Sequence, residues 1–384
     1  GEYMGAYYFI LCFILINGIT ARKHRKWYVV STFLVIFVFA ALRKYTIGID
    51  LELHYARNFE RIAKLPWSEV PSFIAYDPGF NILCKLISYI STDRQAFIIV
   101  TSLIVFGSVA RYIYYYADDV VMESFMFISM YCMFLYMNII AQAIAFAIFL
   151  VAIPCLQEKK YIKYILIVLL ATSMHASAII LLLLVPLSFL PLKRKYVAVF
   201  SLAMPIALMS LDKLAVVFAT IIPEFSRYLD VNNIHGKATG LSNLMLIIII
   251  IYALILFLAW WYLLKSYNEE SVYRLVEKNF GILKKRRDVE VLQLSSNLLA
   301  YATIIVIAAR LAGTNMEVSS RIGYYFYVFS YSLLGRALAS IRDFQERTIF
   351  KFLIYSGMIL FFLVSGSMAA QVYYGVAPYE FFWN

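Results

Sequence analysis

Apolar stretches about as long as a membrane-spanning helix recur along the chain. About 20 apolar residues are needed to cross the hydrocarbon core of a bilayer as a helix. The pattern therefore predicts an all-α polytopic integral membrane protein with about 12 transmembrane helices, within a range of 11–14. These helices are expected near residues 3–20, 27–42, 95–116, 121–137, 138–156, 160–173, 177–191, 196–212, 241–264, 292–311, 321–340 and 349–372.

Two segments depart from this simple repeat. Residues 80–90 are apolar but span only half a membrane and contain Lys85, which predicts a re-entrant or interfacial helix. The first helix lacks the small-residue pattern of a cleavable signal, so we expect it to stay as an anchor. Gly1 in place of Met suggests a processed or engineered start.

The composition supports a membrane protein and sets its sidedness. The chain is 63% hydrophobic and 15% charged, whereas soluble chains are about half apolar. Residues 1–384 are therefore interpreted as a single transmembrane domain. Basic clusters mark the cytosolic side of membrane proteins, so the net charge of +11 indicates topology and not a nucleic-acid partner.

When the predicted helices cross the membrane one after another, all the basic clusters fall on the same side. This side is the cytosol, and it includes the loop 265–291. With Arg111 that side holds 22 of the 34 Lys and Arg residues. Both termini and three long loops then face outward. These extracytoplasmic loops are 43–94, 213–240 and 312–321.

Several chemistries find no support in the sequence. The four cysteines have no CxxC spacing and the four histidines no HExxH pairing, so we expect neither disulfide nor metal. No glycine-rich phosphate loop occurs, so we expect no nucleotide cofactor, and no cofactor of another kind is predicted.

The outward loops carry arginines against the topological trend. Guanidinium groups bind phosphate with two parallel hydrogen bonds, so these arginines, Arg43 and Arg321 among them, resemble an anion site. The alternative is that they snorkel or pair with acidic neighbours such as Glu60, and it stays open for each one.

Four segments could carry chemistry. The first, 42–55, crowds charged groups around Gly48, and the second, YDPGFNIL, places Asp77 where it could cap a short helix. The third holds an ionisable histidine at membrane depth, and the fourth has Glu317 four residues before Arg321 with tyrosines behind. Charge-paired helix ends, a buried neutral histidine and an interfacial tyrosine belt are the structural alternatives.

A further stretch combines two amides with small residues. Asn138 and Gln142 lie four residues apart, on one helix face with Ala141, in a run from 124 to 157 that contains no Asp, Glu, Lys, Arg or His. Packing of helices through small residues and amide hydrogen bonds would explain such a patch. The predicted topology, however, places Asn138 at the outer side, with the arginine-bearing loops.

The order of these motifs resembles one known family. LR, then TIGID with a tyrosine after it, DPGFNIL, N-x-x-x-Q-x-I-A, MHASA and SRIGYYF follow one another between Leu42 and about Phe329. This order is similar to that of the EpsG family, the Wzy-type polymerases of bacterial capsule, exopolysaccharide and O-antigen. The family pattern Asn-x-x-Arg-Gln-x-x-Ala has alanine at position 141 here, as an engineered inactivating substitution or natural divergence would leave it.

The resemblance implies a glycosyltransferase that joins polyisoprenyl-pyrophosphate-linked oligosaccharide repeat units at the outer leaflet, without a metal. The expected base is His175, with Asp50 as the second choice, and position 141 is the place of the family arginine. Arg43 and Arg321 are expected to bind pyrophosphate. The other predicted substrate-binding residues are Tyr55, Asn138, Gln142 and Tyr324.

The same resemblance implies a multi-pass protein of the bacterial plasma (inner) membrane, with its active site outside. Its expected partners are the undecaprenyl-type lipid-linked glycan, membrane lipid, a chain-length regulator and a flippase. A lipid-linked oligosaccharide flippase and an O-antigen ligase-like transferase remain alternative functions. A non-catalytic scaffold would have no reason to gather arginines outside.

Overall fold

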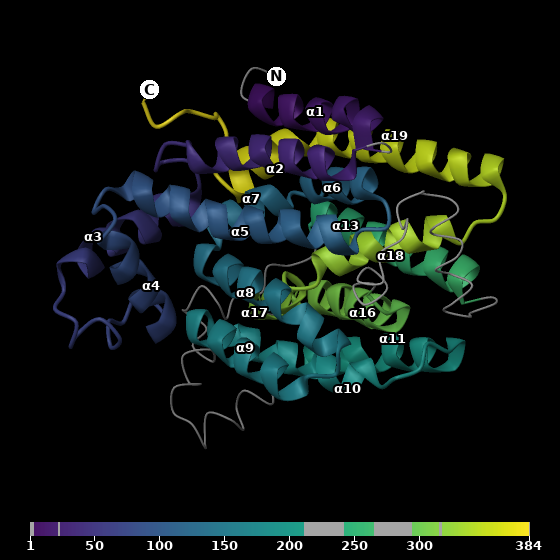
Figure 1. Cartoon of the computed structure of the whole chain (residues 1–384). Coiled ribbons are helices and arrows are strands. Elements are labelled where there is room, and N and C mark those ends of the chain that lie inside the picture. Colours follow the sequence, from purple (N-terminus) through teal and green to yellow (C-terminus); the bar gives the residue numbers. More distant parts are fainter. Residues whose placement is uncertain (1–3, 22–23, 211–241, 265–293, 315–316, 384) are drawn as a thin grey trace. The chain divides into compact units, whose positions relative to one another are not determined.

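The computed structural model describes all residues except 1–3, 22–23, 211–241, 265–293, 315–316 and 384. Helices account for most of the described chain, and the only strand-like pairing in it is an isolated antiparallel bridge between Arg43 and Phe381. Each predicted apolar stretch contains helix where it is described, although turns interrupt 121–137 and 321–340 (Figure 1). The prediction of an all-α polytopic membrane protein is confirmed.

Long apolar helices dominate this architecture. Among the described helices, four are long and apolar enough to cross a membrane, at Arg94–Tyr116, Ile140–Gln157, Asn243–Leu263 and Phe344–Tyr373. A fifth span would combine Val120–Ser129 with Cys132–Asn138, which meet at an angle of 58°. Shorter apolar helices complete the set at Gly5–Ile19, Tyr161–Met174, Ala176–Ser188 and Ser296–Ala312.

The chain forms two compact units. The first comprises residues 1–182, 280–293 and 349–384, and the second comprises 183–279 and 294–348. The prediction of a single transmembrane domain over 1–384 stays a prediction, as does the assignment of its loops to the two sides of the membrane.

In the first unit, α5 (Arg94–Tyr116) packs against α2 (Arg25–Ala41) and α8 (Ile140–Gln157), which in turn packs against α9 (Tyr161–Met174) (Figure 1). α1 (Gly5–Ala21) packs on α2 and on α6 (Val120–Ser129). The unit also contains α7 (Cys132–Asn138), most of α19 (Phe344–Met368) and a π-helical end of α19 (Ala369–Tyr373).

The segment 43–94, which is predicted to face outward, has its own short helices. A π-helical turn (Leu51–Tyr55) leads into α3 (Ala56–Lys64), and α4 (Pro78–Ser88) packs against α3. α4 is the predicted half-length helix, and its Lys85 ammonium donates to the backbone oxygens of Ala63 and Leu65, at 2.8 and 2.7 Å. These bonds satisfy carbonyls at the end of α3, where a helix has no internal donors for them.

In the second unit, α16 (Ser296–Ala312) contacts α10 (Leu184–Ser188), α11 (Arg194–Met209), α13 (Asn243–Leu258), α17 (Glu317–Gly323) and α18 (Tyr327–Ala339). A 3₁₀ segment (Ala176–Leu183) precedes α10, and a π-helical turn (Ala259–Leu263) follows α13. Arg336 is fully buried on α18 and donates to the Ser296 hydroxyl at 3.1 Å and to the Leu294 carbonyl. This cation therefore fixes the start of α16.

Candidate functional site

Tyr55 joins three of the sequence motifs in the first unit. Its ring stacks on that of Tyr76, with centroids 5.1 Å apart and planes 7° from parallel. Its hydroxyl accepts a hydrogen bond of 3.1 Å from the backbone amide of Ala141. The amides of a helix's first turn have no partner within the helix, so Tyr55 satisfies one such amide at the start of α8.

Asn138 lies one turn before Ala141 and ties the same region to two other segments. Its side-chain oxygen accepts from the backbone amide of Asp50 at 3.2 Å. Its side-chain nitrogen donates to the carbonyls of Phe134 and Tyr374, both at 3.0 Å. The amide predicted to bind substrate thus holds Asp50 in place.

Gly48 allows this approach. Its φ of +113° is a conformation that side-chain-bearing residues rarely adopt, and a Cβ there would lie 3.3 Å from the Asn138 side-chain oxygen. Its amide donates to the Gly375 carbonyl at 2.8 Å. The backbone conformation therefore favours the glycine of the TIGID motif, and a larger residue would also crowd Asn138.

The predicted base lies at a break between helices. α9 ends at Met174, His175 has extended backbone (φ −156°, ψ 116°), and a 3₁₀ segment follows. The Nδ1 atom of the half-buried His175 ring is 2.7 Å from the Ser177 hydroxyl. The backbone amide of Ala176 donates to Asp77 Oδ2 at 2.8 Å, which connects this break to the start of α4.

The sequence predicted that the Asp77 carboxylate would cap its own helix, α4. The structure shows a different arrangement. The carboxylate makes no side-chain capping bond at the start of α4. The Asp77 backbone carbonyl instead accepts from the amides of Phe80 and Asn81, at 3.1 and 3.2 Å. The carboxylate is thereby available to the residue that follows His175.

Arg43 supports this region from beneath the surface. It is 1% exposed, and its guanidinium donates to the carbonyls of Ala40, Ile47 and Met137 and to the Ser102 hydroxyl. These partners lie at the end of α2, in the segment before Asp50, on α5 and at the end of α7. Arg43, which was predicted to bind pyrophosphate, thus connects α7 to the segment before Asp50 in this structure.

Contacts therefore connect the predicted residues of the first unit. We call the connected residues the motif cluster: Asp50, Tyr55, Tyr76, Asp77, Asn138, Ala141 and His175. Ala141 and Gln142 are 4% and 1% exposed, whereas Asp50, Tyr55 and His175 are half-buried. Burial raises the pKa of the Tyr76 phenol, and the nearby Tyr55 and Asp50 add to this effect. This phenol stays protonated and can donate a hydrogen bond.

Arg94 is one of the arginines in the loops predicted to face outward. It forms an ion pair with Glu60, which was the alternative to a role in an anion site. Arg94 donates to both carboxylate oxygens of Glu60, at 2.5 and 2.9 Å, and lies 4.7 Å from the ring centroid of Tyr45. Its hydrogen bonds hold the pKa of Glu60 below the usual range. Arg94 is therefore already paired.

Arg321 and Tyr324 belong to the second unit, on and just after α17. Both are half-buried. The Arg310 guanidinium lies 5.5 Å from the Tyr324 ring centroid and 5.3 Å from that of Tyr327. Arg310 thus faces Tyr324 of the SRIGYYF motif and Tyr327, which directly follows the motif. The Glu317 side chain lies outside the description, so the predicted pair with Arg321 does too.

Comparison with known proteins identifies the chain. The model of the EpsG family matches residues 26–381, which is most of the chain. The chain belongs to the EpsG family. Membership supports a polysaccharide polymerase-type function with a lipid-linked oligosaccharide substrate in a membrane. No curated protein and no solved structure matches the chain.

Within this EpsG chain, the sequence did not predict the role of Tyr76 or the bond from Ala176 to Asp77. Tyr76 directly precedes the Asp-Pro-Gly turn, which was the available signal. Arg310 was one of the arginines counted toward an anion site, but nothing in the sequence links it to Tyr324. Among the described residues, no three His, Cys, Asp or Glu side chains lie close enough together to hold a metal ion.

Proposed function

We propose that this EpsG protein joins lipid-pyrophosphate-linked oligosaccharide repeat units at the outer leaflet of the bacterial plasma membrane. In this reaction an acceptor hydroxyl attacks the first sugar of the donor glycan. The bond between that sugar and the lipid pyrophosphate breaks, and the lipid pyrophosphate leaves. The sugar–pyrophosphate bond supplies the energy.

The observation that carries the proposal is the convergence of motifs on the start of α8. Position 141, where the family has arginine, is buried and lies within hydrogen-bond reach of Tyr55 through its backbone. The positive end of the α8 helix dipole favours an anion here. A guanidinium at 141 would neutralise the departing pyrophosphate in a setting of low dielectric, where charge stabilisation is strongest.

The motif cluster also contains the groups needed to activate an acceptor hydroxyl. A general base must have a pKa near neutrality, which histidine has in its ordinary form. His175 is our first choice, held by Ser177 and by the neighbouring bond from Ala176 to Asp77. Asp50 is the second choice, and Tyr55 positions the substrate with Gln142. Arg321 and Tyr324 stay proposed contacts of the donor's phosphate and sugar.

The proposal implies that the chain with alanine at 141 turns over poorly. Removal of one transition-state donor lowers the rate by roughly 100- to 1000-fold. Ala141→Arg should therefore raise polymer formation from lipid-linked repeat units by about that factor, read as a ladder on a gel. Ala141→Gln, which has similar reach without charge, is the matched control and should stay near the starting rate.

Other outcomes would favour the alternatives. A single transfer to a non-repeat acceptor, without a ladder, would indicate a ligase-like transferase. No transfer by the Ala141→Arg variant, with movement of labelled lipid between leaflets, would indicate a flippase. A native gene that encodes alanine at 141 would show natural divergence at this position and exclude an engineered substitution.

A further inference from the structure

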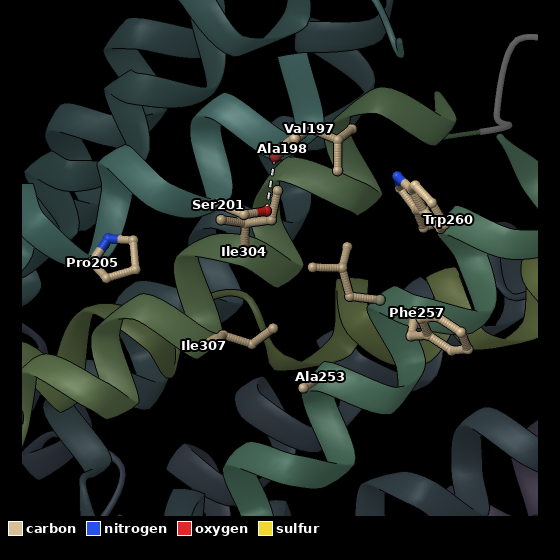
Figure 2. A pocket seen from close by; sticks show the side chains of 10 residues that line it. Val197, Ala198, Ser201, Pro205, Ala253, Phe257, Trp260, Ile304 and Ile307 are labelled. Carbon is tan, nitrogen blue, oxygen red and sulfur yellow. Dashed lines mark hydrogen bonds between the residues drawn. The ribbon is translucent and has the colours of Figure 1, made fainter. Parts of the chain in front are cut away.

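The second unit contains an apolar cavity of about 350 Å³ between α11, α13 and α16 (Figure 2). Val197, Pro205, Ala253, Phe257 and Ile307 are among the side chains that surround it. The Ser201 hydroxyl on its wall donates to the Val197 carbonyl at 2.7 Å, so this polar group is satisfied within its own helix. The cavity therefore suits hydrocarbon, and its volume falls in the range of ligand sites.

The lining residues of α11 form a stripe that runs along the helix. Val197, Ser201 and Pro205 follow one another at intervals of four residues and so share one face. From Arg194 at the start of the helix to Pro205 the distance along the axis is about 16 Å, at 1.5 Å per residue. This is about half of the 30 Å hydrocarbon core, the depth of one leaflet.

The end of the stripe at residue 194 is cationic and aromatic. The Arg194 guanidinium lies 4.6 Å from the ring centroid of Trp260, and Trp260 itself lines the cavity. Lys193 and Lys195 flank Arg194 and are exposed. Tryptophan is enriched where hydrocarbon meets the head groups, and guanidinium binds phosphate in a fork. A ligand here should combine an alkyl chain with a phosphate anion.

We propose that this site binds one anionic phospholipid, with an acyl chain in the cavity and the phosphate on Arg194. The three adjacent cations favour a lipid with net negative charge over a zwitterionic one. The proposal does not rest on the polymerase function. Its basic residues lie on the predicted cytosolic side, whereas the polymerase substrate is proposed to react on the outer side, so the ligand is a membrane phospholipid.

Native mass spectrometry of the purified full chain tests the site. Phosphatidylglycerol and phosphatidylcholine with identical acyl chains are added in equal amounts, and the bound fraction of each is measured. Each cation near the head group contributes a preference of about fivefold for phosphatidylglycerol. Arg194→Gln should therefore lower the preference of the parent chain by about fivefold, whereas Lys163→Gln, which removes an exposed charge from α9 instead, should preserve it.

Filling the cavity tests the acyl chain separately. Ala253→Trp should reduce binding of both lipids, while Leu254→Trp, at an exposed neighbouring position that does not line the cavity, should not. Ala198→Phe, on the opposite wall, provides a second filling variant if the first does not fold. Equal binding of the two lipids by the parent chain, or unchanged binding in both filled variants, would overturn the proposal. Displacement of phosphatidylglycerol by an equal concentration of polyprenyl phosphate would also overturn it.

Discussion

The Tyr55 hydroxyl accepts a hydrogen bond from a backbone amide at the start of α8, and this bond gives a direct test of the motif cluster. Tyr55→Phe removes the acceptor and keeps the ring that stacks on Tyr76. A buried donor without a partner costs about 1–3 kcal/mol. We expect faster hydrogen exchange at the Ala141 amide and a lower thermal midpoint.

Tyr89→Phe is the matched control for this change. The Tyr89 hydroxyl accepts from the Trp67 indole at 2.8 Å, but at an exposed position where water can replace it. Its loss should leave the midpoint nearly unchanged. Equal midpoints for the Tyr55 and Tyr89 variants would show that the bond to Ala141 contributes little.

Gly48 should be the least replaceable residue of the TIGID motif. Gly48→Ala introduces a Cβ at positive φ and 3.3 Å from the Asn138 side chain. Strained backbone of this kind costs on the order of 1–3 kcal/mol. The thermal midpoint should fall, and Gly107→Ala, where a Cβ meets nothing within 4 Å, should not lower it. A stable Gly48→Ala protein would mean that this loop can rearrange.

The sequence shows which residue types gather in the motifs, but it does not show what each one contacts. Asn138, Asp50 and Tyr55 were chosen from their motifs, and the structure does connect them. Arg43 has the same motif-based support and is buried on backbone carbonyls. Whether a motif residue joins the cluster or is buried on carbonyls, as Arg43 is, depends on packing between segments far apart in the chain. No local sequence pattern encodes that packing.

Helix existence was predictable because each span is a long apolar run, but the breaks within spans were not. Tyr131, with φ +62°, separates α6 from α7 inside the predicted helix 121–137. The break at Ile139, in contrast, falls at the predicted boundary between 121–137 and 138–156. The hydrophobic pattern continues without interruption through Tyr131, which the tertiary hydrogen bond of 2.6 Å between the Tyr131 and Ser365 hydroxyls holds in place.

The break after α9 can be tested through Asp77. Asp77→Ala removes the acceptor for the Ala176 amide, whereas Asp77→Asn retains an oxygen at that place. Hydrogen bonds to charged groups contribute about 1.5–3 kcal/mol, so the Ala variant should expose the Ala176 amide to exchange. When each change is combined with Ala141→Arg, polymer formation should fall strongly with Asp77→Ala and less with Asp77→Asn.

The two variants also distinguish positioning from chemistry. If Asp77 itself supplied the base, the Asn variant would lose activity as completely as the Ala variant. If Asp77 only holds the segment after His175, the remaining activity of Asp77→Asn should depend on pH as that of the Ala141→Arg protein does, because His175 still supplies the base. Loss of this pH dependence in Asp77→Asn would contradict the assignment of His175.

The orientation of the chain in its membrane decides where the proposed reaction occurs. Many apolar side chains of α13 and α19 are exposed, as lipid contact requires, but exposure does not say which end faces outside. That assignment comes from the basic clusters alone. Ser72, exposed in the segment before α4, is predicted outside, and Lys163, exposed at the start of α9, is predicted inside.

Single cysteines at these two positions provide the measurement. In a chain with Cys12, Cys84, Cys132 and Cys155 replaced, Ser72→Cys should react with a membrane-impermeant thiol reagent in right-side-out vesicles. Lys163→Cys should react only in inside-out vesicles. The reverse labelling would place the motif cluster at the cytosolic leaflet, because Ser72 and Asp77 lie in the same connecting segment. An outer-leaflet polymerase would then be impossible, while the lipid site at Arg194 would face the outer leaflet and still bind its phospholipid.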